Sequence, residues 1–325
     1  MKDFNNIPRT YINQLAKANK VVYSGKEDKE VIDGLKEKKQ LDKLVYLNEQ
    51  FKYTSSNMTL CKPESNFPDK AKTPELFLSS LINEKHIKKE NINNEWEPIL
   101  SPAIKICALK HDGSSVYLKL VVEKFYKRRK SYGTVFDSYA SFTSAVIHFD
   151  QDGSNEGIIQ VRCSTTDLKK YTEYIMNLMG FAKPYSWHTV PKLTKENAKE
   201  LCNILSAGVA SRHIAIPSTV GSVRFNGKKG INLAVDKTFD SINQAIQGLG
   251  LPTDHTMDET CFFTYTDDKT NINVEAKFEV NIQTGYFKFT KSVPEFVFDH
   301  VLDALVKVNN GSISYQVAAT IEKSS

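Results

Sequence analysis

The sequence predicts an α+β fold: a helical N-terminal region followed by two antiparallel-sheet halves, with helices packed on one face of each sheet. Two observations carry this prediction. Apolar residues in the first hundred positions recur at helical spacing, whereas later segments are rich in strand-forming residues and are joined by short turns. Helices gather after these hairpins, while a doubly wound parallel sheet would need regular alternation of strand and helix. The sheets are therefore expected to be antiparallel.

The N-terminal region, residues 1–98, is predicted to be mainly helical. A helix is expected over about 8–18, and a charge-rich helical stretch with one exposed face over 25–51. Residues 55–72 are polar and contain prolines, which favours a loop between helices.

The next helix has the clearest start signal of this region. Thr73 supplies a capping hydroxyl, Pro74 occupies the first helical position and Glu75 places an acid in the first turn. A helix is therefore expected to begin at this point. Two prolines at 98–102 indicate a boundary, after which the pattern changes to strands.

The middle segment, residues 99–190, is predicted to be a basic strand-turn-strand-helix half. The sequence His111-Asp112-Gly113 indicates a turn between its first two strands. Strands are expected over 103–109, 116–126, 134–149 and 158–163, followed by a helix over 165–179.

The last segment, residues 191–325, is predicted to form a second sheet-plus-helix half. Its expected elements are a helix over 192–208, a hairpin over 223–235 turning at Asn226-Gly227, a helix over 238–249, strands over 272–281 and 286–290, a helix over 293–308 and a strand over 313–321. The order strand, turn, strand, helix occurs in both halves, which indicates a possible internal duplication.

Charge and cysteine content narrow the class of protein. The chain carries 43 basic and 38 acidic side chains, and residues 101–190 hold 12 basic against 8 acidic ones. The five cysteines form no CxxC pair, and neither a signal peptide nor a membrane span is evident. These features predict a cytoplasmic protein that does not enter a membrane.

The strongest functional signal is an unbroken run of four cations at the expected tip of a hairpin. Such a cluster can contact a phosphate backbone, and neighbouring aromatic rings can stack on open bases. A second basic tip follows in the last segment. The residues predicted to bind nucleic acid are Lys124, Lys127, Arg128, Arg129, Lys130, Tyr132, Arg224, Lys228 and Lys229. The alternative is that charged tips only keep edge strands soluble.

A second hypothesis is a metal-dependent nuclease of the PD-(D/E)xK type. Glu275 and Lys277 form a strand-borne E-x-K triplet, and Asp258 lies upstream across an expected hairpin. Carboxylates on adjacent strands would hold Mg²⁺ while the lysine orients the attacking water. The competing interpretation is an amphipathic strand, because apolar residues alternate with these polar ones.

No complete cofactor or metal signature is present. The seven histidines do not have zinc-ligand spacing, and Asp150-Gln151-Asp152-Gly153 fits a turn better than a calcium loop. Cys163 and Cys202 are expected to be small core residues rather than nucleophiles. No cofactor is therefore expected.

The leading hypothesis is an intracellular nucleic-acid-binding protein without catalysis, whose basic tips contact phosphates of DNA or RNA. Protein partners or self-association through the N-terminal region are also expected. The alternatives are the nuclease and a structural adaptor subunit of a larger protein assembly. A role in antiviral defence is a hypothesis about context, to which no particular residue contributes.

Overall fold

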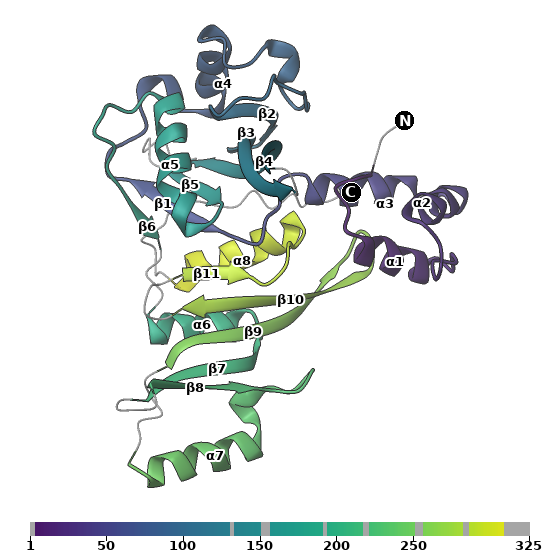
Figure 1. Ribbon diagram of the computed structural model, residues 1–325, viewed down its shortest axis with the longest axis vertical. Coiled ribbons are helices and arrows are strands. Elements are labelled where there is room, and N and C mark those ends of the chain that lie inside the picture. The colour runs from purple at the N-terminus through teal and green to yellow at the C-terminus, as the bar shows by residue number, and fades with distance from the viewer. Residues whose placement is uncertain are drawn as a thin grey trace, which may run out of the picture. The chain divides into compact units, whose positions relative to one another are not determined.

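The structure is a computed structural model, which describes residues 4–130, 133–150, 157–190, 194–216, 221–250, 256–281 and 286–308. The described residues form two compact units (Figure 1). The first unit combines Met1–Ser56 with Pro191–Gly311, and the second contains Asn57–Val190. Each unit has one antiparallel sheet and its own helices, and the α+β prediction is confirmed.

The second unit is built on a six-stranded sheet in the order β2-β3-β4-β5-β1-β6. Its elements are β1 (Thr59–Pro63), α4 (Pro74–Asn83), β2 (Lys105–Asp112), β3 (Ser115–Lys130), β4 (Gly133–Phe149), β5 (Gly157–Arg162), α5 (Thr165–Met179) and β6 (Trp187–Val190). Leu118 and Ile147 of the strands share one buried cluster with Phe77 of α4 and Tyr171 of α5. Both helices therefore cover the same face of the sheet, as the sequence predicts.

Local signals position these helices where they are expected. Thr73 Oγ1 accepts a hydrogen bond of 3.3 Å from Leu76 N at the start of α4. Helix α5 ends at Gly180, whose φ of +90° suits glycine because it has no Cβ. The backbone N of Phe181 then donates to Met176 O at 3.0 Å and closes the last turn.

The first unit contains a five-stranded sheet in the order β11-β10-β9-β7-β8. Its elements are α1 (Arg9–Ala18), α2 (Asp28–Glu37), α3 (Leu41–Phe51), α6 (Lys195–Ile204), β7 (Gly208–Ile216), β8 (Gly221–Asn226), α7 (Lys237–Gly248), β9 (Thr256–Asp267), β10 (Ile272–Asn281), β11 (Tyr286–Phe289) and α8 (Glu295–Val308). Alternate residues of β10, including Val274, Ala276 and Phe278, are buried. This alternation buries one face of the sheet.

The N-terminal helices belong to this same unit through contacts that bridge most of the sequence. Tyr46 OH on α3 donates to Asp267 Oδ1 at 3.1 Å. The backbone N of Phe289 on β11 donates to Ser56 O at 2.8 Å, just after these helices. Helices α1–α3 therefore pack with the strands of the last segment.

Asp267 provides a test of this docking. Asp267 is 5% exposed, and its carboxylate accepts hydrogen bonds from Tyr46 OH, from Thr270 N at 2.9 Å and from Thr270 Oγ1. Asp267→Ala leaves these donors without an acceptor, and we expect the free energy of unfolding to fall by about 2 kcal/mol. The measurement is chemical denaturation followed by circular dichroism. The exposed neighbour Asp268 is the control, and an equal loss in Asp268→Ala would contradict the explanation.

The two sheets repeat one layout. Strands β3, β4 and β5 are consecutive neighbours and are followed by α5, and β9, β10 and β11 are likewise followed by α8. The expected order strand, strand, helix is thus present in both units. A common origin of the two segments stays a prediction, as does separate folding of the predicted segments 1–98, 99–190 and 191–325.

The loop predicted over 55–72 is wrong in part, because Thr59–Pro63 forms β1. Leu60 and Cys61 are buried, and Leu60 lies opposite Gln160 of β5 and Val190 of β6. Both partner strands are about a hundred residues away. The local sequence therefore contains little of the signal that makes this segment a strand.

The hairpin predicted over 223–235 is also wrong. Strand β8 pairs with the preceding β7, with Arg224 opposite His213. The following residues turn away because Asn232 Oδ1 accepts hydrogen bonds from Val209 N at 2.8 Å and from Ala234 N at 3.0 Å. This side chain caps a short 3₁₀ turn where a second strand was expected.

Two helix predictions have wrong limits. The stretch 25–51 is divided into α2 and α3, because Lys39 between them has a φ of +58°. The helix expected to reach Gly208 ends at Ile204, and Gly208 begins β7 instead. The strand expected over 313–321 lies outside the described residues.

Candidate nucleic-acid interface

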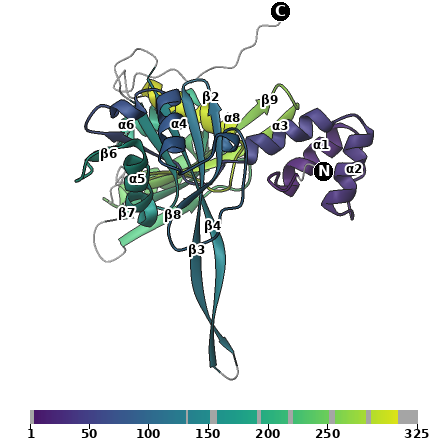
Figure 2. The same ribbon diagram turned by 90° about the horizontal axis from the view of Figure 1, so that it is seen from above.

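The four-cation run lies on a β-hairpin, as predicted, but it belongs to strand β3, which continues to Lys130, and not to a loop after residue 126. Strands β3 and β4 pair from Ser115 opposite His148 to Lys130 opposite Gly133. The neighbouring strands stop much earlier: β2 reaches only Val121 of β3, and β5 only Ser144 of β4. Beyond these residues the hairpin is a two-stranded ribbon that extends past the other strands of its sheet (Figure 2). Residues 125–130 and 133–139 are called the arm.

The pairing register divides the arm into two faces. Residues directly opposite each other point to the same side of a sheet, and the side alternates along each strand. Phe125, Lys127 and Arg129 therefore share one face with Phe136, which lies opposite Lys127. We call this the Phe125 face. The other face continues the side of the sheet that packs against α4 and α5.

Four aromatic rings of the arm are exposed. On the Phe125 face, Phe125 is 58% and Phe136 is 69% exposed. On the other face Tyr126 and Tyr139 are also exposed, and their ring centroids are 5.9 Å apart. Large aromatic side chains are normally buried in a core, and a group of exposed ones often marks a surface that a partner covers.

Two of the predicted cations pair with acids of the same unit. Arg128 Nη2 is 3.5 Å from Asp137 Oδ2 across the arm, and Lys124 Nζ is 3.3 Å from Asp167 Oδ2 at the start of α5. Lys127 forms no ion pair with any residue that the structure describes, and the same holds for Arg129 on its face. The Phe125 face therefore carries the uncompensated positive charge.

Two predicted residues, Lys130 and Tyr132, remain at the end of this run. Lys130 forms the last backbone pair of the hairpin, opposite Gly133. Tyr132 lies outside the described residues.

The second predicted basic tip belongs to the other unit. Lys228 and Lys229 lie on an exposed turn after β8. Arg224 is within β8, where its Nη2 donates to Asp258 Oδ1 at 2.7 Å. Because Asp258 already compensates it, Arg224 is a weaker candidate for phosphate contact than Lys127 and Arg129.

The residues of the nuclease hypothesis are not brought together. On β10, Glu275 lies opposite Thr264 and Lys277 opposite Phe262, whereas Asp258 lies opposite Asn281. Asp258 is thus four residues from Lys277 and six from Glu275 along the strands, or roughly 13 and 20 Å. Ligands of one Mg²⁺ must all lie within about 2.1 Å of the ion. Burial alternates along β10, as the amphipathic interpretation requires.

Asp258 instead belongs to a polar cluster that the sequence analysis missed. Its Oδ2 is 2.9 Å from His213 Nδ1, and its other oxygen accepts from Arg224. The three residues come from β9, β7 and β8, which are neighbours in the sheet, although β9 follows β8 only after helix α7. No spacing motif could have indicated them. Their hydrogen bonds join three strands of the sheet.

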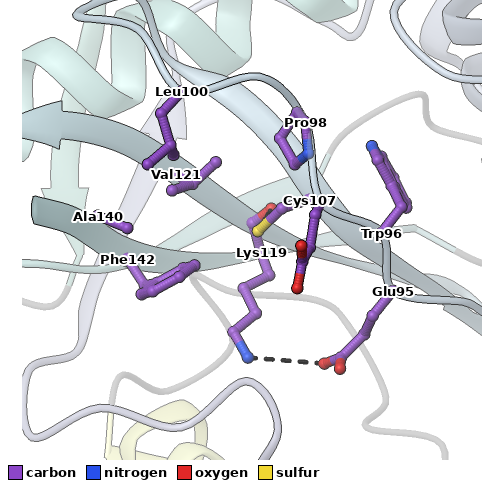
Figure 3. A pocket seen from close by; sticks show the side chains of 10 residues that line it. Glu95, Trp96, Pro98, Leu100, Cys107, Lys119, Val121, Ala140 and Phe142 are labelled. Atoms are coloured by element: carbon purple, nitrogen blue, oxygen red, sulfur yellow. Dashed lines mark hydrogen bonds and ion pairs between the residues drawn. The ribbon is translucent and has the colours of Figure 1, made fainter.

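A cavity of about 500 Å³ was likewise not predicted. It opens at the base of the arm on the Phe125 face, between β2, β3, β4 and the segment 95–100 (Figure 3). Phe142 and Lys119 lie on the strands, and Glu95 lies across from Phe142 on the neighbouring segment, whereas the indole of Trp96 is directed away from Phe142 and packs against the core cluster. This segment is held beside β2 because the backbone N of Trp96 donates to Cys107 O at 2.8 Å.

Cys107 and Cys163 are not activated as nucleophiles. All five are free and buried, as expected for Cys163 and Cys202. Burial raises the pKa of Cys107, beside the cavity, to about 11, and that of Cys163 to about 12. Both thiols are therefore protonated at neutral pH, whereas a reactive cysteine is a thiolate.

Two further findings concern metals and membranes. The residues that the structure describes contain no group of three or more His, Cys, Asp and Glu side chains able to hold a metal ion. Within the same part of the chain, every helix is too short or too polar to cross a bilayer.

Comparisons of this chain with protein-family models, with curated proteins and with solved structures found no match. The structure itself defines the class: an α+β protein of two units, one of which carries a two-stranded ribbon with exposed cations and aromatic rings.

Proposed function

We propose that this protein binds nucleic acid through the arm, without catalysing a reaction on it. The observation that carries the proposal is the combination on one ribbon of Lys127 and Arg129, which form no ion pair among the described residues, with the exposed rings Phe125 and Phe136. The arm holds four basic side chains and one acidic side chain. Its chemistry thus complements a polyanion that also presents flat apolar surfaces.

The physical basis is the same for DNA and RNA. Lysine and arginine that neutralise phosphates release condensed counterions, which favours binding at low salt. Aromatic rings add stacking on unpaired bases, and a two-stranded ribbon also fits the major groove of a duplex. The exposed phenylalanines distinguish this arm from a hairpin that is charged only for solubility, because solubility would favour polar residues in their place.

We also propose that the protein works in the cytoplasm. The supporting observation is that the chain has an odd number of cysteines, five, with no CxxC pair among them. This pattern suits a reducing compartment better than a disulfide framework.

Neutralising the cations of the arm tests the proposal. We expect the triple variant Lys127→Gln, Arg128→Gln, Arg129→Gln to bind fluorescein-labelled DNA and RNA oligonucleotides at least tenfold more weakly at about 50 mM salt. Each lost phosphate contact should also reduce the slope of log affinity against log salt by about 0.7 to 0.9. Fluorescence anisotropy titrations over a range of salt concentrations measure both quantities.

The matched control removes three exposed lysines from another surface of the same unit: Lys85→Gln, Lys88→Gln and Lys89→Gln. It changes net charge equally and should change affinity much less. Unchanged binding by the arm variant would refute the proposal. So would a failure of the unaltered protein to bind both DNA and RNA at low salt.

The exposed phenylalanines also favour a second candidate, the structural adaptor. A protein partner could cover Phe125 and Phe136 and would present acidic residues to Lys127 and Arg129. The two candidates differ in their response to nucleic acid. An adaptor would form a larger particle with a protein partner and would not bind oligonucleotides, which light scattering coupled to size-exclusion chromatography can detect.

A further inference from the structure

The face of the arm that lies opposite the Phe125 face is largely satisfied by its own residues. The rings of Tyr126 and Tyr139 pack against each other, with centroids 5.9 Å apart. Arg128 Nη2 is 3.5 Å from Asp137 Oδ2 on the same face. A ligand on this side would therefore have to compete with a carboxylate for the cation and with a neighbouring ring for the tyrosines.

The Phe125 face instead presents exposed rings next to cations that nothing compensates. Phe136 lies opposite Lys127, two residues further out than Phe125, and Arg129 lies two residues beyond Lys127. Successive side chains of this row are therefore about 7 Å apart along the ribbon. Neither cation forms an ion pair among the residues that the structure describes. Flat apolar surfaces and positive charge are thus within reach of one extended ligand.

The chemistry of these side chains favours unpaired bases over a duplex. The grooves of a duplex present base edges, which carry hydrogen-bond donors and acceptors. A phenylalanine ring has neither, so in a groove it would leave such edge groups without partners, at a cost in free energy. An unpaired base offers its flat face, on which an aromatic ring can stack. The exposed rings therefore add affinity for a single strand but not for a duplex.

The face changes character where the arm joins the sheet. Phe142 continues the row about 13 Å from Phe125, but Lys119 Nζ lies 5.6 Å from the centre of its ring and 3.6 Å from Glu95 Oε1. Glu95 and Glu97 line the cavity at this place, and their negative charges repel phosphates. The outer part of the arm is therefore the binding surface for a polyanion, and the cavity lies beyond its end.

From this juxtaposition we infer that the protein binds single-stranded nucleic acid along the Phe125 face, with unpaired bases stacked on Phe125 and Phe136 and phosphates held by Lys127 and Arg129. This inference rests on the proposed function and specifies its ligand. Every base has a flat face, so binding depends little on sequence. Single strands are bound in preference to duplex of the same length.

Removal of both rings tests the inference. The double variant Phe125→Leu, Phe136→Leu keeps apolar side chains and every charge of the arm. It should bind fluorescein-labelled oligodeoxythymidine at least about fivefold more weakly, the factor that corresponds to the lower limit for stacking of one base. The slope of log affinity against log salt should stay unchanged, because no phosphate contact is lost. Fluorescence anisotropy titrations measure both quantities.

The matched control removes two rings from the other face of the same arm, in the double variant Tyr126→Leu, Tyr139→Leu. Its affinity for oligodeoxythymidine should change much less than that of the phenylalanine variant. Far-UV circular dichroism establishes that both variants are folded. An equal loss in the two variants would contradict the assignment of the strand to the Phe125 face.

A change in the ligand gives an independent readout. A strand of equal length from which all bases are absent has the same phosphates but nothing to stack. The unaltered protein should bind this abasic strand at least about fivefold more weakly than oligodeoxythymidine, whereas the phenylalanine variant should bind the two alike. Duplex of the same length should bind the phenylalanine variant as well as it binds the unaltered protein.

The outcomes separate the two proposals. If oligonucleotides bind and the glutamine variant of the arm loses affinity, but the phenylalanine variant binds oligodeoxythymidine normally, the single-strand inference is overturned and the proposed function stands. The same conclusion follows if the phenylalanine variant loses affinity for duplex equally, because the rings would then act as wedges between base pairs. If no oligonucleotide binds, both proposals are overturned. A loss confined to single strands that carry bases supports both.

Discussion

Phe289→Ala is expected to lower the free energy of unfolding of the first unit by about 3 to 5 kcal/mol. Phe289 is completely buried, and its ring centroid is 5.1 Å from that of Phe287 and 5.0 Å from that of Phe298 on α8. Its backbone N also donates a hydrogen bond to Ser56 O, just after the N-terminal helices. Removal of the ring leaves a cavity where β11 meets α8. Whole domains are stable by only about 5 to 15 kcal/mol, so this loss is large.

Urea denaturation followed by far-UV circular dichroism measures the effect. Phe136→Ala is the matched control, because the same atoms are removed from a side chain that is 69% exposed on the arm. It should change stability by less than about 0.5 kcal/mol. A similar loss in both variants would contradict the assignment of Phe289 to the core.

A loss of stability of about 3 kcal/mol is expected on acidification because of His148. Its ring is buried, with Nε2 3.2 Å from Gln160 Oε1 and Nδ1 3.1 Å from Ser115 Oγ. Burial lowers the pKa of His148 from 6.5 to about 4, an effect that the hydrogen bond to Gln160 Oε1 opposes and the nearby charge of Arg162 reinforces. Histidine is therefore neutral in the folded protein near pH 5.

The direction of the change in stability with pH follows from proton binding. Between pH 6.5 and about 4 the unfolded chain binds a proton that folded His148 does not. Stability from this group is complete above pH 6.5 and decreases as the pH falls through that range. Both tryptophans, Trp96 and Trp187, lie in the same unit as His148, so their fluorescence in urea at pH 7.5 and pH 4.5 reports its unfolding. The higher pH lies about 1 unit above the upper end of this range, and the lower pH lies close to its lower end, so the two conditions span the expected change in stability.

His148→Gln is the control, since glutamine has no proton to gain in this range. Its stability should depend less on pH between the two conditions than that of the unaltered chain. An identical pH dependence in both proteins would show that other groups cause the acid sensitivity.

Local sequence patterns predicted the helices and strands whose limits are set by interactions between residues close in the sequence. The helix start at Thr73 follows from a capping hydroxyl and a proline, and β10 has the limits that its periodicity indicates. Helix α8 ends at Val308 as expected but begins at Glu295, two residues later than predicted. Elements whose partners are distant were missed. Strand β1 and strand β7 have few strand signals of their own and form because neighbouring strands complete their hydrogen bonds.

For the candidate site as well, only the features that depend on contiguous residues could be predicted. The run of cations and its place on a hairpin follow from composition and turn residues, but the division of the arm into faces needs the register. Lys127 and Arg129 lie with the exposed phenylalanines, whereas Arg128 pairs with Asp137 on the other face. The cavity could not be predicted, because its lining residues come together only where the segment 95–100 lies beside β2, β3 and β4.

The sequence by itself determined the α+β class, the long hairpin and its positive charge, because strand period, turn residues and charge are properties of contiguous residues. Tertiary structure alone decided that helices α1–α3 join the sheet of the last segment, that Arg224 is compensated by Asp258, and that a cavity opens beside Glu97. The physical reason is that these features arise from packing between residues far apart in the chain. The free energy of such contacts depends on the whole fold.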